Sequence, residues 1–237
     1  MAKNQQQQVL DVNEAISKSE AFITKYKRQL VGGLVAVVLV VAAGFFGYQF
    51  YSQRNAKGQA QLSMGVQLMA QAQQDSTAYT KALNGDGQFQ GFLKMQSSFS
   101  MTPAANLAKG FAGECYAHMG KYDEAIKQLE SFSTKGDMTI SPALTACLAN
   151  CYAQKNQLDK AVSTFKEAAK MADNEGVSPV FLMEAARLLE AQNNKAEANK
   201  LYTQIQKDYP AAQVCQTQTQ DGTVVEPEIL KYIERTK

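Results

Sequence analysis

The chain has 237 residues, of which 45% are hydrophobic and 19% are charged, and its formal net charge is +2. This composition is sufficient for a packed core and excludes a chain that is disordered throughout. Residues 52–237 carry 19 basic and 19 acidic side chains. Because this part is neutral and has no basic stripe to neutralise phosphates, we do not expect nucleic acid as a partner.

The first 29 residues are expected to form a short arm. Residues 4–8 read NQQQQ and predict a polar, disordered tip. After the tip, residues at alternating spacings of four and three form one stripe of a predicted helix, namely Val12, Ile16, Ser19, Ile23, Tyr26 and Leu30. Such a helix either lies on a membrane surface or docks a cytoplasmic or membrane partner, and the sequence leaves both alternatives open.

The segment from Leu30 to Tyr51 predicts a transmembrane helix. Its 22 residues carry no charge. As a helix the segment would extend about 33 Å, enough to cross the hydrocarbon core of a bilayer. A buried core helix is disfavoured by the length of the run. A cleaved signal peptide is disfavoured because the stretch before the segment is long and partly acidic.

The charges that flank this segment predict its orientation. Four basic side chains precede it and two follow it closely: Lys18, Lys25, Lys27 and Arg28, against Arg54 and Lys57. Basic flanks are retained in the cytoplasm. We therefore expect a single-pass membrane protein with its N-terminus in the cytoplasm and its C-terminal part on the far side of the membrane.

Residues 52–105 predict a linker helix followed by capping helices. A helix is expected from Asn55 to Gln74, where small and apolar residues recur every four positions. The run Asn84-Gly85-Asp86-Gly87 predicts a turn, and it lacks the further acidic residues of a calcium loop. A short amphipathic helix is expected over Phe89 to Phe99. Together these elements form an incomplete pair that would cap an array.

The C-terminal half contains a fragment that recurs three times. Ala125, Ala161 and Ala198 mark equivalent positions, separated by 36 and 37 residues. A period of this length indicates a stacked array of helix pairs. The predicted pairs are 104–119 with 122–132, 142–155 with 158–171, and 179–192 with 195–208. Pro210 follows the third pair, where a proline ends a helix.

The predicted layout is an arm (1–29), a transmembrane helix (30–51), the linker and capping helices (52–105), a repeat array (106–212) and a C-terminal loop with a capping helix (213–237). Within the array, small residues let paired helices approach closely, and bulky residues fill the space between them. These motif positions are Gly113, Tyr116, Gly120, Tyr122, Ala125, Leu129, Ala149, Tyr152, Ala161, Phe165, Ala186, Leu189, Ala198, Tyr202 and Pro210.

This pattern resembles the tetratricopeptide repeat family, which implies an all-α solenoid that binds other proteins. Three substitutions depart from the family motif: Lys109, Thr145 and Lys195 stand where bulky or aromatic residues are usual. The whole layout is similar to that of bacterial YfgM-like proteins, ancillary subunits of the Sec translocon. That resemblance implies a periplasmic scaffold near the translocon and periplasmic chaperones.

In the family, the first helices of successive pairs line a groove for partners. The corresponding positions here are Gly110, Glu114, His118, Ala146, Asn150, Gln154, Met183, Arg187 and Glu190. Co-chaperones of the family bind a carboxylate with several Lys, Arg and Asn residues, of which only Asn150 and Arg187 are present. The resemblance therefore implies a helix or an unfolded segment as the partner, and a merely solvated face is the alternative.

The sequence contains no motif for catalysis, a cofactor or a metal. No phosphate-binding loop, nucleophile elbow or metal-spaced His/Cys cluster occurs, so we expect neither an enzyme nor a small-molecule substrate. Cys147 and Cys151 are one helical turn apart, a poor arrangement for a disulfide bond. Packing explains Cys115, Cys147 and Cys151, although a bridge from Cys115 to either of the others stays open. Cys215 is expected in a loop as a free thiol.

Three functions remain at this point. The first is a periplasmic scaffold for protein–protein interaction at a bacterial inner membrane, with the translocon, a chaperone or client chains as partners. The second is a holdase-like chaperone for newly translocated chains. The third is an organellar membrane receptor with its repeats in the cytosol, which the basic N-terminal flank disfavours.

Overall fold

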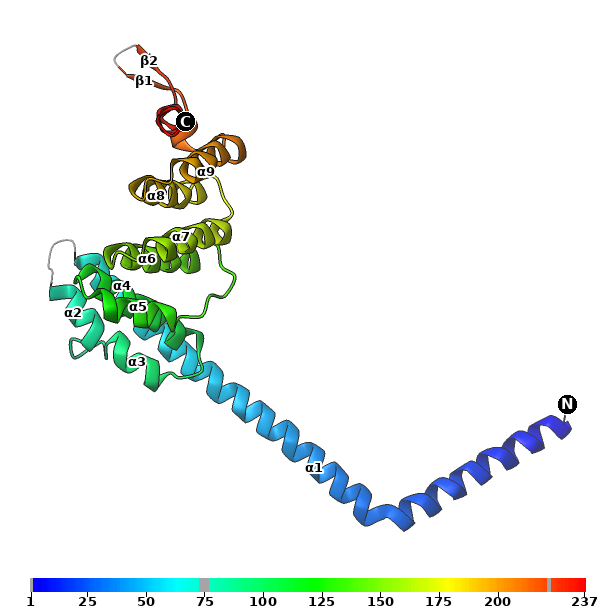
Figure 1. The fold of residues 1–237 in the computed structure, drawn as a ribbon. Coiled ribbons are helices and arrows are strands. Elements are labelled where there is room, and N and C mark those ends of the chain that lie inside the picture. Colours follow the sequence, from blue (N-terminus) through cyan, green and yellow to red (C-terminus); the bar gives the residue numbers. More distant parts are fainter. Residues whose placement is uncertain (1, 73–76, 221–222) are drawn as a thin grey trace. The chain divides into compact units, whose positions relative to one another are not determined.

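The computed structural model describes residues 2–72, 77–220 and 223–237. The chain divides into two compact units, residues 1–53 and residues 54–237. Helix α1 (Ala2–Gln71) runs through the boundary between them. The predicted arm, span and linker are thus parts of one continuous helix (Figure 1). The prediction of a disordered tip at 4–8 is wrong, because glutamine is a good helix former and no Gly or Pro interrupts this run. The predicted end of the linker helix, 73–74, lies outside the described residues.

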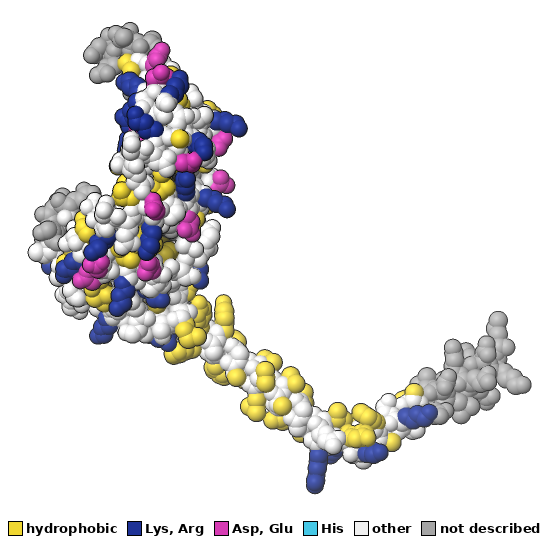
Figure 2. All heavy atoms as spheres, in the orientation of Figure 1, with side chains coloured by type: hydrophobic (Ala, Val, Ile, Leu, Met, Phe, Trp, Pro, Cys, Tyr) yellow, Lys and Arg dark blue, Asp and Glu magenta, His cyan; other side chains and the backbone are white. Residues whose placement is uncertain are grey.

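The apolar part of α1 in the first unit is exposed on every side. Its large side chains, among them Val40 and Phe46, are about two-thirds exposed, and hydrophobic atoms surround this stretch of the helix (Figure 2). A window of 18 residues within Ala15–Gln71 has a mean hydropathy of 2.6 and buries no residue. This helix is therefore long enough and apolar enough to cross a membrane.

The second unit begins where the last turns of α1 pack against two short helices, α2 (Thr77–Asn84) and α3 (Phe92–Ser98). Gly65 of α1 lies directly against the rings of Phe89 and Phe92, where a Cβ atom would collide with both. The absence of a side chain thus lets α1 approach this core closely. Helix α2 was not predicted; it is a short helix between residues 73–76 and the following turn.

The turn at 84–87 has the conformation that its glycines predict. Gly85 and Gly87 have φ angles of 101° and 99°, which L side chains rarely adopt. The carboxylate of Asp86 accepts hydrogen bonds from the backbone N–H groups of Gln88 and Phe89, at 3.0 and 2.8 Å. This closed turn directs Phe89 into the core.

Three helix pairs follow in phase, as the sequence predicts. They are α4 (Pro103–His118) with α5 (Tyr122–Glu130), α6 (Ile140–Gln154) with α7 (Leu158–Ala172), and α8 (Ser178–Ala191) with α9 (Lys195–Asp208). Each pair packs on the next along the array (Figure 1). The observed bounds lie within two residues of the predicted ones, and the all-α solenoid fold is confirmed.

The motif residues form the contacts between paired helices. Gly113 of α4 lies against Leu129 of α5, where a Cβ atom would come within 2.5 Å of its Cγ atom. In the next two pairs Ala149 and Ala186 are fully buried. Phe165 and Tyr202 are buried in a single apolar cluster that joins the second and third pairs. No pair buries its apolar face alone, so the pairs depend on each other for stability.

The C-terminal segment contains more structure than the predicted loop. A short 3-10 turn, η1 (Gln213–Cys215), precedes two antiparallel strands, β1 (Gln218–Gln220) and β2 (Thr223–Val225), with Gln218 opposite Val225. Helix α10 (Glu228–Arg235) follows and packs on α9. The loop prediction is thus wrong for the strands, although Asp221-Gly222 is a typical hairpin sequence. Both of these residues lie outside the described ones.

Candidate partner-binding groove

A hollow of about 460 Å³ opens between the first helices of the repeat pairs. Its lining comes from α4, the start of α5, α6 and α8: Glu114, Ala117, His118, Tyr122, Ala143, Ala146, Cys147, Asn150, Cys151, Gln154 and Phe181. Small and apolar side chains make up the floor, and amide, imidazole and carboxyl groups surround it. We call this feature the first hollow.

A side chain from a helix outside the repeats packs against the polar edge of the first hollow. The ring of Tyr79, from α2, stacks on the ring of His118 at 4.7 Å between centroids and 7° between planes. The Nε2 atom of His118 lies 3.9 Å from a carboxylate oxygen of Glu114. Burial raises the pKa of Glu114, and the charge of His118 opposes this shift only in part. Among the described residues that line this hollow, Glu114 carries the single carboxyl group, and none is Lys or Arg.

The cysteines of α4 and α6 are unpaired. Cys115, Cys147 and Cys151 are all free thiols, and Cys215 is also free. Interaction with Cys151 and burial both raise the pKa of Cys147, and burial raises the pKa of Cys115 to about 12. A thiol whose pKa is raised is a weaker nucleophile and metal ligand at neutral pH, whereas interaction with Cys147 lowers the pKa of Cys151. Within the described residues no three His, Cys, Asp or Glu side chains are grouped so that they could hold a metal ion.

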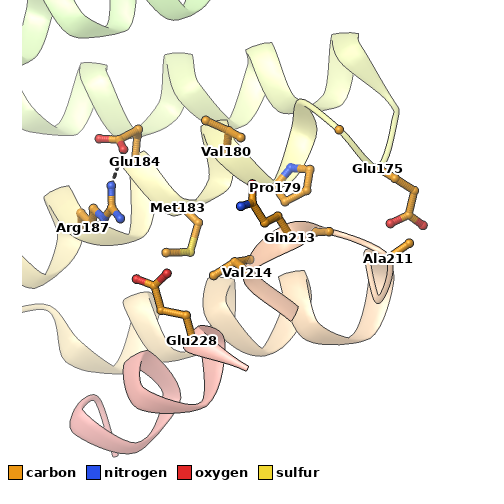
Figure 3. Close-up of a pocket in the computed structure, with 12 residues that line it drawn as sticks. Glu175, Pro179, Val180, Met183, Glu184, Arg187, Ala211, Gln213, Val214 and Glu228 are labelled. Carbon is orange, nitrogen blue, oxygen red and sulfur yellow. Dashed lines mark hydrogen bonds and ion pairs between the residues drawn. The ribbon is translucent and has the colours of Figure 1, made fainter. Parts of the chain in front are cut away.

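A second hollow, of about 570 Å³, lies between α8, residues 211–214 and α10 (Figure 3). Pro179, Val180 and Met183 from α8 face Val214 across it. Its edge carries charged groups from separate segments, which are Glu175, Glu184, Arg187 and Glu228.

The arginine of the second hollow is already paired. Arg187 donates hydrogen bonds to Glu184 at 2.6 Å and to the hydroxyl of Tyr232 at 3.2 Å. The hydrogen bond with Tyr232 raises the pKa of Arg187, and the Glu184 carboxylate adds to the shift. Two of its five N–H donors are engaged in these contacts, and the carboxylate of Glu184 already compensates its charge.

Seven of the nine predicted groove residues line the two hollows. Glu114, His118, Ala146, Asn150 and Gln154 meet at the first, and Met183 and Arg187 at the second. Their role in binding stays a prediction.

The remaining two predicted groove residues lie in packing positions. Gly110 is buried directly beneath Leu144 of the next pair, so it serves the packing of α4 on α6. Glu190 accepts a bidentate hydrogen bond from Arg235 of α10 and another from the hydroxyl of Tyr202. Its carboxylate attaches α10 to the array.

Several residues of the hollows could not be assigned from the repeat pattern. Tyr79 comes from a helix that was not predicted, and Val214 and Glu228 come from the C-terminal segment. Phe181 lies at a helix position outside the family's groove set, yet it closes the first hollow. Only an uninterrupted apolar run at the start of α8, Pro179 to Met183, signals this surface in the sequence.

Comparison with known families agrees with this architecture. Residues 21–167 match the model of the tetratricopeptide repeat-like domain, and residues 181–212 match a tetratricopeptide repeat. The first match covers more than half of the chain, which therefore belongs to the tetratricopeptide repeat-like domain family. No curated protein matches the chain. Tetratricopeptide repeats generally mediate protein–protein interaction, and this is the general role of the fold described above.

Proposed function

We propose that this protein is a membrane-anchored scaffold whose repeat groove binds a segment of another protein. The observation that carries the proposal is the first hollow, which joins three repeat pairs on the side formed by their first helices. An apolar floor with a polar edge suits an extended or helical peptide that buries apolar side chains and pairs its backbone polar groups.

A clamp for a C-terminal carboxylate is the less suitable alternative. Such a clamp needs free cationic donors in the groove. Gly110 is covered by Leu144, and the guanidinium of Arg187 is held by Glu184 and Tyr232. The exposed donors that remain in the first hollow are uncharged amides, those of Asn150 and Gln154, and the imidazole of His118.

The proposed address is the periplasmic face of a bacterial inner membrane. Its support is the uncharged run at 30–51 and the excess of basic residues before it. The similarity to YfgM-like ancillary subunits extends the proposal to partners near the Sec translocon, with periplasmic chaperones or client chains as further candidates.

Photo-crosslinking at matched positions tests the groove. A photoreactive phenylalanine derivative is placed at Asn150, which is exposed in the first hollow, or at Ser163, which is exposed on α7. We expect adducts with a defined protein from Asn150 in intact membranes, and none of the same adducts from Ser163. Equal adducts from both positions, or none from Asn150, would contradict the proposal.

Thiol labelling tests the proposed topology. Cys215 is half-buried, so an added thiol on an exposed surface, Ser163→Cys, is the better reporter. We expect an impermeant maleimide to label this variant in spheroplasts, at a level well above that of the native chain. Labelling only after the inner membrane is permeabilised would place the repeats in the cytosol.

A second candidate function, a holdase-like chaperone, is favoured by the second hollow. Val180 in its wall is 53% exposed, so the hollow offers apolar surface to non-native chains. A holdase should suppress aggregation of several unrelated unfolded clients, and Val180→Asp should weaken this suppression. A scaffold with one partner should show no such general suppression.

A further inference from the structure

The loop between α3 and α4 carries an apolar side chain that packing does not explain. Met101 is 94% exposed, the highest value among the large hydrophobic side chains of the described residues. Its φ angle of 67° lies in the left-handed region, which is unfavourable for a residue other than Gly, Asn or Asp. The backbone thus holds this methionine outward at an energetic cost, although the side chain gains no contact within the protein.

Arg54 attaches this loop to α1. Its guanidinium donates two hydrogen bonds to the carbonyl oxygen of Ser98, at 2.8 and 3.2 Å, and a third to the hydroxyl of Ser100, at 3.3 Å. One turn later, Gly58 lies against Phe99 and Ala104. The loop is therefore fixed to the first residues of the second unit.

The contacts along α1 follow an order. Arg54 contacts Ser98 and Ser100, Gly58 contacts Phe99, and Gly65 contacts Phe89 and Phe92. Among these contacts, those of the α3–α4 loop involve the residues of α1 that are nearest to the apolar segment. Only two residues lie between Arg54 and Tyr51, the end of the apolar segment, so the chain from one to the other is at most about 11 Å long.

The charges around the loop are basic. Arg54, Lys57 and Lys94 lie in the segments that meet there, and both lysines are exposed. The sequence has no Asp or Glu between residues 21 and 74, or between 87 and 113. This combination of an exposed apolar tip with basic side chains is complementary to an anionic lipid surface.

We propose that the α3–α4 loop is a second membrane contact, with Met101 inserted at the boundary between the lipid headgroups and the acyl chains and Arg54, Lys57 and Lys94 facing anionic headgroups. The inference rests on the proposed membrane span of α1. A loop in contact with the membrane would limit how far the second unit can tilt about the single transmembrane helix. It also gives the exposed side chain of Met101, whose backbone is in the left-handed region, a contact that the protein itself does not provide.

The absence of tryptophan from the chain allows a direct test. Single Trp residues are introduced as Met101→Trp, Tyr51→Trp or Val177→Trp, and the full chain is reconstituted in nanodiscs of phosphatidylcholine and phosphatidylglycerol. Val177 is the matched control because it is an exposed apolar residue near the start of α8, two helix pairs along the array. Lipids brominated on their acyl chains quench tryptophan that reaches them.

We expect brominated lipids to reduce the emission of the Met101→Trp and Tyr51→Trp variants and to leave that of Val177→Trp unchanged. Lowering the phosphatidylglycerol content, or adding Arg54→Gln, should reduce the quenching of Met101→Trp more than that of Tyr51→Trp. Far-UV circular dichroism checks that each variant is folded.

Two results would overturn the inference, and a third would overturn its basis. Quenching of Tyr51→Trp without quenching of Met101→Trp would show that the loop does not reach the bilayer. A blue-shifted but unquenched emission from Met101→Trp would indicate a protein partner there instead of lipid. If Tyr51→Trp itself is not quenched, the proposed membrane span is wrong.

Discussion

Residues of the same chemical kind have opposite environments in the two units. Phe46 in the apolar part of α1 is 69% exposed, whereas Phe165 in the repeat array is 2% exposed. The glycines differ in the same way. Gly44 has no side-chain neighbour within 4 Å, whereas Gly113 lies directly against Leu129. The array buries its apolar residues against protein, whereas the apolar residues of the first unit are exposed.

The spacing of the apolar residues accounts for this difference. In the array they recur on one face of each helix, so that stacked helices can cover them. In residues 30–51 they continue around the whole helix, and no single neighbour could cover every side. Hydrophobicity alone therefore does not predict burial within the protein.

The largest effect is expected from charges in the exposed apolar segment. Val37→Asp combined with Val41→Asp should cost about 5–7 kcal/mol of membrane insertion, comparable to the whole favourable contribution of the segment. The doubly substituted chain should appear in the soluble fraction after carbonate extraction. Val66→Asp, at an exposed valine of the second unit, should stay with the membrane fraction. Retention of the double variant would contradict a membrane span.

Removal of one phenyl ring from each unit should have different effects on the free energy of unfolding. Phe165→Ala leaves a cavity in the core and should lower the free energy of unfolding by about 3–5 kcal/mol. Phe46→Ala removes a ring that contacts no core and should leave it unchanged. Urea denaturation of the full chain in detergent, followed by circular dichroism, measures both. Equal effects would refute the contrast between the units.

A smaller effect is expected from the residue that caps α6. Burial opposes ionisation of Asp137, but hydrogen bonds from Ser141 and from the N–H groups of Thr139 and Ile140 outweigh it and lower the pKa of Asp137 to about 2. Asp137→Ala should lower the free energy of unfolding by about 1 kcal/mol at neutral pH.

The pH dependence of this cap has a defined sign. Because the pKa is lower in the folded state than its usual value of 3.8, the stabilisation is complete above about pH 5 and is lost as the pH falls towards 2. The difference in stability between the native chain and Asp137→Ala should therefore shrink over this range. Unfolding curves at pH 7, 4 and 3 measure it, and a constant difference would rule out this capping role.

The smallest effect is expected at the end of the array. Arg235 makes a bidentate pair with Glu190 and lies 4.4 Å from the ring centre of Tyr232. Since its side chain is half-exposed, Arg235→Ala should cost about 0.5–1 kcal/mol. Hydrogen exchange should accelerate in α10 and not in α4. Lys237→Ala, which removes an exposed pair with Glu234, is the control and should have no measurable effect.

The repeat architecture could be predicted because its signals are local. Apolar spacing, the small residues Gly113 and Ala149, and the turn at Gly120 recur within single helix pairs. The same locality made the apolar segment at 30–51 recognisable. Helix α2 and the strands at 218–225 were missed because each is too short for a periodic pattern to form.

Two predicted groove residues had other roles because their partners are distant in the sequence. Gly110 is covered by Leu144, and Glu190 is held by Arg235, which lies 45 residues later in the chain. A family position specifies where a residue lies on its own helix. It does not specify what another segment places above it.

From the sequence alone, the helix pairs, their order and the uncharged helix before them were determined, because the spacing of apolar residues and the length of an uncharged run are both properties of one segment. The two hollows, the stacking of Tyr79 on His118 and the outward position of Met101 were decided only by the tertiary structure. Each of these requires side chains from separate helices or loops to meet, and the space between packed elements is not encoded by any one of them.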